Sequence, residues 1–201
     1  MEGLFGIRHL SSGTIKMHGK EVKIKRSRDA MDAGLGMITE DRRGNGIFGC
    51  LSIKDNTGIS IYNKHLKAGF ILDHPTINKI VDDSIKQLSI KTPSMQQHIE
   101  NLSGGNQQKV IVSRWLANDP EILIMDEPTR GIDVGAKHEI YEIMEQLADQ
   151  GKSIIMISSE MPELLGMADR VYVMCNGKIT GEIDQKEDMT QEKVMSFATQ
   201  F

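Results

Sequence analysis

The chain has 201 residues, enough for one well-packed domain or for a domain with a small extra lobe. With 39% hydrophobic and 26% charged residues, its composition is that of an ordinary globular protein and excludes a disordered or fibrous one. A formal net charge of −4 argues against binding nucleic acid through phosphate attraction. No apolar run approaches the ~18 residues of a membrane span. Cys50 and Cys175 lie far apart without CxxC spacing, which fits a reducing compartment and predicts neither a disulfide scaffold nor a metal knot.

The first quarter of the chain mixes short elements. Residues 1–13 pass directly into apolar positions without a capping residue, so we expect the tail of a helix that began earlier; a short independent helix is the alternative. The alternation at 14–24 predicts a hairpin that turns at Gly19-Lys20. A brief helix at about 28–33, a buried strand at 35–39 and a charged, glycine-rich loop at 40–49 follow.

The middle and C-terminal parts predict a helical lobe inserted in an α/β core. From about 52 to 100 the apolar residues fall at helical spacing and strand signals disappear. Further on, the sequence predicts helices at about 105–118, 134–149, 161–170 and 191–200, buried strands at 121–128 and 152–159, and a hairpin at 170–183 around Asn176-Gly177. This alternation is typical of a parallel sheet with crossover helices.

Two glycine motifs resemble phosphate-binding sequences without meeting their requirements. "GNGIFG" (44–49) spells GxGxxG, yet no helix opens on its last glycine, so we expect a mobile loop. "QGKS" (150–153) resembles the end of a P-loop, but Gln146 replaces the first glycine and the lysine enters a strand rather than a helix. It is predicted to be a helix stop and a turn, and no GxxxxGK(S/T) occurs in the chain.

The segment "ILIMDEP" (122–128) places two acids at the carboxyl end of a predicted parallel strand, where ligands bind in α/β proteins. Asp126 could hold Mg²⁺ through water, and Glu127 could polarise an attacking water. The alternative is an acidic strand end that only caps a neighbouring helix.

The segment "LSGGNQQK" (102–109) combines an N-cap residue, Ser103, with the glycine pair Gly104-Gly105. Free N–H groups at a helix start favour anions even without a lysine. The alternative is a capped helix with a tight entry turn.

Together and in this order, the two segments resemble the ATP-binding cassette (ABC) ATPases, whose LSGGQ signature precedes the Walker B strand. "TRGIDVGA" (129–136) resembles the D-loop, and "GTIKMHGKEV" and "MISSEMPELLGMADRVYVMCNGKITGE" resemble the hairpin after the P-loop helix and the switch region. "TEDRR", "LSGGNQQKV", "DEPTRGIDVGAK" and "SSEMPE" are most similar to the second nucleotide-binding half of bacterial monosaccharide importers of the ribose and galactose/methyl-galactoside type. The segment at 114–137 leans toward the galactoside branch.

The resemblance implies a P-loop NTPase-like ABC cassette core, 1–51 and 119–201, with an inserted α-helical subdomain, 52–118, that carries the signature. It implies ATP and Mg²⁺ as cofactors, Asp126 as the Mg²⁺ residue and Glu127 as the catalytic residue. The implied nucleotide-binding residues are Ser103, Gly104, Gly105, Asn106, Gln107, Asp133, Glu40 and Ser159. The signature residues would close on the γ-phosphate of an ATP that another cassette holds.

Three departures from the family weaken the chain's own site. The Walker A segment is absent and would lie just before Met1, so we expect a cassette truncated at its N-terminus that does not hydrolyse ATP alone. Glu40 stands at or beside the Q-loop glutamine, and Ser159 stands at the switch histidine. Serine cannot supply the proton relay or the cationic phosphate contact of a histidine.

The resemblance also implies partners and a location. These are the N-terminal cassette of a longer protein, a membrane permease contacted by the helical lobe and the loop at 40–49, and indirectly a periplasmic sugar-binding protein, at the cytoplasmic face of a bacterial inner membrane. No nucleic acid is expected. Two alternatives remain, a soluble ABC protein of translation or DNA maintenance and a non-catalytic binding or regulatory module.

Overall fold

Residues 1–200 are described in the computed structural model, where the chain forms two compact units, Met1–Ile157 and Ser158–Phe201. Within these residues no helix is both long and apolar enough to cross a membrane. The expected helical lobe, 52–118, belongs entirely to the first unit.

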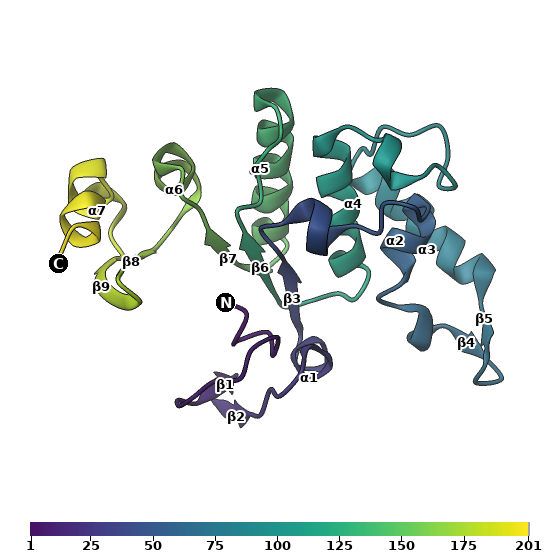
Figure 1. Ribbon diagram of the computed structural model, residues 1–201, viewed down its shortest axis with the longest axis horizontal. Coiled ribbons are helices and arrows are strands. Elements are labelled where there is room, and N and C mark those ends of the chain that lie inside the picture. The colour runs from purple at the N-terminus through teal and green to yellow at the C-terminus, as the bar shows by residue number, and fades with distance from the viewer. Residues whose placement is uncertain (201) are drawn as a thin grey trace. The chain divides into compact units, whose positions relative to one another are not determined.

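A three-stranded parallel sheet forms the centre of the first unit (Figure 1). Its order is β3-β6-β7, with β3 at Leu35–Ile38, β6 at Ile122–Asp126 and β7 at Ser153–Ile157. Ile38 pairs with Met125, and Asp126 pairs with Ile157, so the carboxyl ends of all three strands meet at one edge. The predicted parallel sheet is therefore confirmed. β3 and most of β6 are buried, whereas β7, at the edge of the sheet, is only half-buried rather than buried as predicted.

Helices pack against this sheet through a closely packed core. α4, Gly104–Leu116, contacts β3, and α5, Val134–Asp149, contacts β7. α5 has the predicted amphipathic pattern and buries Ile140, Ile143, Met144 and Leu147. The ring of Trp115 meets Phe5 edge-on at a centroid distance of 5.3 Å, which ties the end of α4 to the N-terminal turn.

The N-terminal segment forms a hydrogen-bonded turn rather than a regular helix. The Ile7 N–H donates to Glu2 O at 2.9 Å and the Gly6 N–H to Gly3 O at 3.3 Å. This is the bonding pattern of a Schellman motif, and Gly6 takes its required positive φ of 73°. Residues 2–7 thus have the hydrogen bonds typical of a helix C-terminus, without a regular helix.

The predicted hairpin and first helix are present, with the turn one residue earlier than expected. β1, Ile15–Met17, pairs with β2, Lys20–Val22, so Lys20 belongs to the strand. His18 and Gly19 form the turn with φ of 48° and 76°, because a two-residue hairpin turn of this type needs two positive φ values. α1 follows at Ser27–Asp32.

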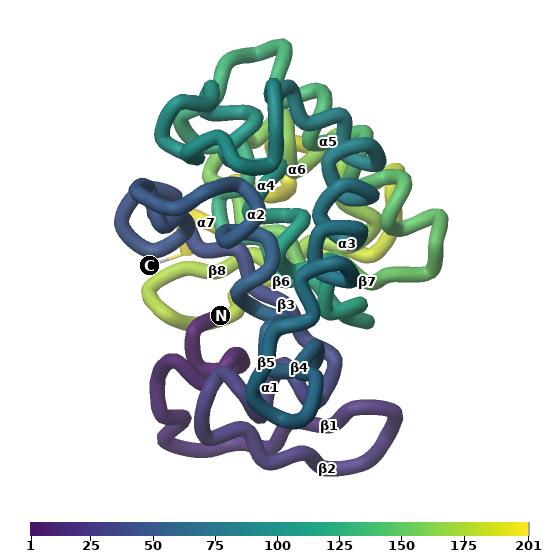
Figure 2. Tube along the Cα trace, turned by 90° about the vertical axis from the view of Figure 1, so that its right-hand side faces the viewer, coloured from purple at the N-terminus to yellow at the C-terminus, as the bar shows by residue number. Residues whose placement is uncertain are grey.

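The helical lobe contains α2, Ile53–Gly58, and α3, His74–Gln87, which pack with α4 (Figure 2). A short hairpin of β4, Leu66–Lys67, and β5, Ile71–Leu72, lies between α2 and α3. The expectation of a purely helical lobe missed it, because two-residue strands leave no readable alternation.

The second unit holds α6, Met161–Met167, the hairpin of β8, Val171–Cys175, and β9, Lys178–Ile183, and α7, Gln191–Ala198. The hairpin turns at Asn176-Gly177, as predicted, with φ of 48° and 76°. Its buried core consists of Val171, Val173, Ile183, Met189 and Val194.

Core packing around β6 gives the first prediction. Ile124 is fully buried at the centre of the sheet, whereas Ile71 in β5 is 54% exposed. Ile124→Ala should lower the free energy of unfolding by about 2–5 kcal/mol, because it leaves a cavity that the neighbours cannot fill. Ile71→Ala, the matched control, should change it by less than about 0.5 kcal/mol. Urea unfolding of both variants measures this, and equal losses would contradict the assigned core.

Candidate functional site

The signature segment begins helix α4 in the predicted way. Ser103 is the N-cap residue, and its side chain is exposed. The Ser103 Oγ accepts a hydrogen bond from Asn106 Nδ2 at 2.9 Å and a longer one from the Asn106 N–H at 3.5 Å. The helix therefore starts with an exposed hydroxyl beside backbone N–H groups that have no intrahelical acceptor.

The glycine pair lets the first turn of α4 approach the segment that precedes and begins α5. A Cβ on Gly105 would lie 2.4 Å from the Cβ of Ala136, which no side chain could tolerate. A Cβ on Gly104 would lie 3.4 Å from Gly131 O. Sequence reasoning assigned these glycines to a close approach of ligand, whereas the structure shows that they first serve a close approach within the chain.

Asn106 and Gln107 hold the surroundings of this turn. The Asn106 Oδ1 accepts from the Lys91 N–H at 2.8 Å. Gln107 is only 6% exposed, and its Nε2 donates to Leu102 O at 3.1 Å and Ile99 O at 3.3 Å. Both amides thus fix the backbone that enters the helix.

The acidic pair lies at the carboxyl edge of the sheet. Asp126 is the last residue of β6, and burial is the main cause that raises the pKa of its carboxyl, with the amino group of Met1 opposing and Glu127 and Glu2 adding to the rise. Glu127 has a left-handed φ of 47°, held by its N–H donating to Ile157 O at 2.9 Å. A non-glycine residue in this conformation costs free energy, and such positions cluster at functional sites.

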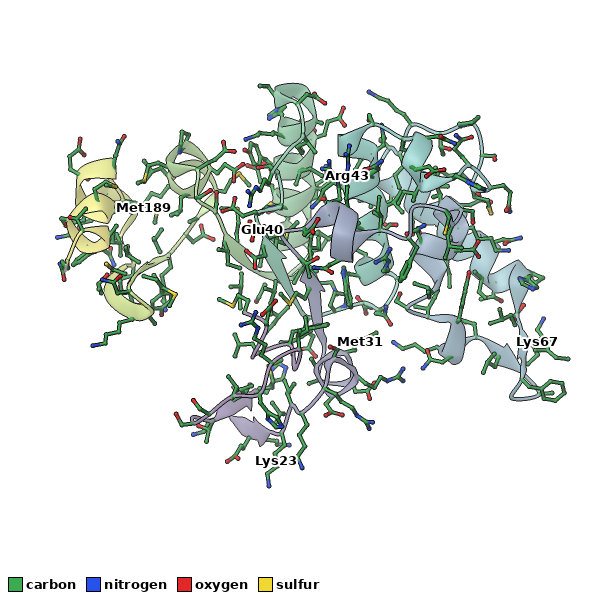
Figure 3. The ribbon with its side chains drawn as sticks, viewed as in Figure 1. Lys23, Met31, Glu40, Arg43, Lys67 and Met189 are labelled. Atoms are coloured by element: carbon green, nitrogen blue, oxygen red, sulfur yellow. The ribbon has the colours of Figure 1, made fainter. Side chains whose placement is uncertain are left out.

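Glu40 lies between the end of β3 and the turn that contains Arg43 (Figure 3). Its carboxylate forms an ion pair with Arg130, four residues beyond Asp126 in the chain. Arg42 donates to the carbonyl of Gly131 at 3.3 Å and reaches that of Arg130 at 3.5 Å. The loops that follow β3 and β6 are therefore connected by Arg42 and Arg130, to which the sequence analysis assigned no role.

Asp133 and Ser159 occupy different surroundings. Asp133 is exposed and is the N-cap of α5, where its Oδ1 accepts from the Ala136 N–H at 3.0 Å. Ser159 is exposed and lies in the second unit, two residues after β7.

The two glycine motifs, "GNGIFG" and "QGKS", both lie in turns of the chain. Residues Arg42–Gly46 form a π-helical turn capped by Asp41, whose side chain accepts from the Gly44 N–H at 2.8 Å. Gly46 is buried, and its carbonyl accepts from Arg114 Nη1 at 2.7 Å. The glycine loop therefore contains a hydrogen-bonded turn that the sequence analysis did not predict, because the arginine that binds it lies 68 positions away. "QGKS" is the predicted stop, with Gly151 at a φ of 83° between α5 and β7.

The donor set suits Mg²⁺ only as one part of a larger coordination shell. Among residues 1–200, no group of three or more His, Cys, Asp or Glu side chains could hold a metal ion. Asp126 supplies one carboxylate. Burial disfavours its ionised form, and a nearby cation would offset that penalty. Mg²⁺ commonly binds through one or two carboxylates plus water and substrate phosphates, so this residue fits such a site.

The predicted residues of the first unit thus fall into two groups. Glu40, Asp126 and Glu127 lie at the sheet edge. The start of α4 with Ser103 lies against residues 131–136. The first group offers carboxylates for a cation and a water, and the second offers neutral donors for an anion.

Fold and motif order define the class of protein. The chain belongs to the ABC transporter family, whose model matches residues 1–130. A nucleotide-free ATP-binding cassette from an ABC transporter superimposes with a TM-score of 0.82 at 20% identity, covering 97% of this chain and 78% of that one. The cbiO1 protein of Clostridium perfringens, part of an ABC transporter complex, gives a TM-score of 0.75 at 24% identity over 97% of this chain and 75% of its own. The predicted ABC cassette fold is confirmed.

Relatives with higher sequence identity are named for the sugars whose import they serve. The chain is 51% identical over 201 residues to the galactose/methyl galactoside import ATP-binding protein of Clostridium tetani, covering 100% of this chain and 40% of that protein. It is 48% identical over 199 residues to the ribose import ATP-binding protein of Oceanobacillus iheyensis, covering 99% and 40%. The chain therefore spans about 40% of the length of these relatives.

The raised pKa of Asp126 predicts a pH-dependent effect of its removal. A carboxyl with a folded pKa above its ordinary 3.8 binds protons more tightly in the folded state, so stability falls as pH rises from about 3.8 through the folded pKa. Asp126→Asn should therefore raise the urea midpoint at pH 7, and this gain should shrink as pH falls toward 3.8. Asp82→Asn on the exposed surface of α3 is the control. A destabilised Asp126→Asn variant at pH 7 would contradict the burial penalty.

Proposed function

We propose that this chain is the signature-bearing part of the second nucleotide-binding cassette in an importer of monosaccharides. Two relatives that are 51% and 48% identical to the chain are ATP-binding proteins for galactose/methyl galactoside import and for ribose import. Its partners would be an N-terminal cassette, a membrane permease and, through the permease, a sugar-binding protein. It would act at the cytoplasmic face of the membrane, with ATP and Mg²⁺ as cofactors.

One observation carries the mechanistic part of the proposal, namely the exposed Ser103 at the start of α4. Its hydroxyl and the N–H groups of Gly104 and Gly105 form a donor set that suits a phosphate, aided by the helix dipole. Lys109 does not take part in this donor set, because it is buried further along the helix. We assign these donors to the γ-phosphate of an ATP bound by the N-terminal cassette.

The acidic edge would serve a second nucleotide in a weaker way. Asp126 would hold Mg²⁺ through water, and Glu127 would polarise the attacking water. The carboxylate of Glu40 pairs with Arg130, and Ser159 has no ionisable group in the physiological range. Both replacements favour slow hydrolysis at the site that contains Glu127.

Neither alternative from the sequence gains support. The two relatives described above are import ATP-binding proteins for galactose/methyl galactoside and for ribose, not proteins of translation or DNA maintenance. A purely regulatory module would have no use for the exposed donor set at Ser103.

The two groups of residues predict different losses in the assembled importer. Ser103→Ala should lower ATP turnover by at least about tenfold, because it removes a donor to a phosphate that carries more charge in the transition state. Glu127→Gln should lower turnover by less than about threefold if its site contributes little. Steady-state phosphate release measures both, with Ser12→Ala, an exposed serine, as the control. The reverse order of losses would contradict the proposal.

The isolated chain is expected to lack ATPase activity. It contains no GxxxxGK(S/T) sequence to cradle the β- and γ-phosphates, and Asp126 and Glu127 cannot replace that cradle. Phosphate release from the purified chain with Mg²⁺-ATP should equal that of buffer. Mg²⁺-dependent release that Glu127→Gln abolishes would show that the chain hydrolyses ATP by itself.

A further inference from the structure

Lys109 is a buried lysine that the proposed phosphate site does not use. Its side chain is only 3% exposed, although it lies just five residues beyond the start of α4. Buried lysines require a charged partner and further acceptors, because desolvation of an ammonium group is costly. The partners of Lys109 therefore indicate what holds it there.

Those partners come from two other segments. Lys109 Nζ lies 2.7 Å from Glu139 Oε2 on α5 and donates to the carbonyl of Ser89 at 3.3 Å. Lys91 Nζ lies 3.6 Å from the same carboxylate. The hydrogen bond from Lys109 is the main cause that lowers the pKa of Glu139, with Lys91 adding to it. Lys109 thus joins α4, α5 and the segment 89–91.

Segment 89–91 contains a strained residue, Ser89, whose carbonyl accepts the hydrogen bond from Lys109. The Ser89 N–H donates to Lys86 O at 3.2 Å, and the Ile90 N–H donates to Ile85 O at 2.9 Å, which together form a Schellman motif at the end of α3. Ser89 occupies the left-handed position of this motif with a φ of 49°, where glycine is usual. The bond from Lys109 fixes the carbonyl of this residue.

The same segment reaches the signature through Asn106. The Lys91 N–H donates to Asn106 Oδ1 at 2.8 Å, which orients the amide so that its Nδ2 donates to Ser103 Oγ at 2.9 Å. Because Ser103 Oγ also accepts from the Asn106 N–H at 3.5 Å, its acceptor positions face its own helix. Among residues 1–200 the hydroxyl hydrogen has no acceptor, so it remains available as a donor.

We propose that Lys109 and Glu139 are positioning residues that act through segment 89–91 and Asn106 to hold the Ser103 hydroxyl as a hydrogen-bond donor toward phosphate. This inference rests on the proposed function of Ser103. It assigns a role to the lysine of "LSGGNQQK" without any contact between that lysine and the nucleotide.

The first test follows the connection in the purified chain. Lys109→Met removes the charge and retains much of the length of the side chain, and the Glu139 left behind still has Lys91 nearby. Hydrogen exchange of the Lys91 amide, followed by NMR, should accelerate by about tenfold or more in Lys109→Met and in Glu139→Gln. Glu142→Gln is the matched control, because it alters an exposed pair with His138 on the same helix. Unchanged exchange in both test variants would overturn the inference.

The second test measures ATP turnover of the assembled importer. Lys109→Met and Glu139→Gln should each lower kcat by about tenfold and the double variant by little more, because both break one connection. Lys109→Arg, which can pair with the carboxylate, should restore kcat to within about threefold of the original protein.

Ser103→Ala in the same assay separates the two proposals. A loss of turnover in Ser103→Ala together with full activity in Lys109→Met and Glu139→Gln would overturn this inference alone. Full activity in Ser103→Ala would overturn the proposed function of the signature and this inference with it.

Discussion

The close approach between the first turn of α4 and the first turn of α5 is the constraint on which the site depends. It requires a residue without a side chain at position 105, because a Cβ there would lie 2.4 Å from that of Ala136. The contact fixes the exposed N-cap Ser103 relative to the segment that follows the acidic strand end. The contact therefore brings together two segments whose touching residues, Gly105 and Ala136, are 31 positions apart in the chain.

Much of the fold could be predicted because local pattern and tertiary environment agree. The apolar runs of β6 and β7 have the short length of strands. The apolar residues of α5 recur with the 3.6-residue period of a helix. The β4–β5 hairpin and the one-residue shift of the first turn were not predicted, since they depend on φ values at His18 and Ala68 that side-chain chemistry does not favour. The π-helical turn at 42–46 depends on a distant arginine, which no local pattern reveals.

The site was predictable in its positions but not in its connections. Motif order located the N-cap Ser103, the acids at the end of β6 and the N-cap Asp133, because each occupies a helix or strand terminus with a defined chemistry. The pairing of Glu40 with Arg130 joins residues 90 positions apart in the chain and follows only from the parallel order of β3 and β6. The burial of Lys109 likewise needs the packing of α4 on α5.

Arg114 joins α4 to residues 46–56 through a buried charge. Arg114 is 7% exposed, and its guanidinium donates to Gly46 O at 2.7 Å and to Asn56 O at 2.6 Å, with no carboxylate partner among residues 1–200. Burial lowers its pKa to about 10, so it keeps its charge at neutral pH. Removing these carbonyl acceptors while the guanidinium stays buried would leave a charge without hydrogen bonds, which costs more than losing a neutral contact. The arginine therefore ties α4, which begins after Ser103, to residues 46–56 through buried hydrogen bonds, so a displacement of either segment would have to break those bonds or carry the other segment with it.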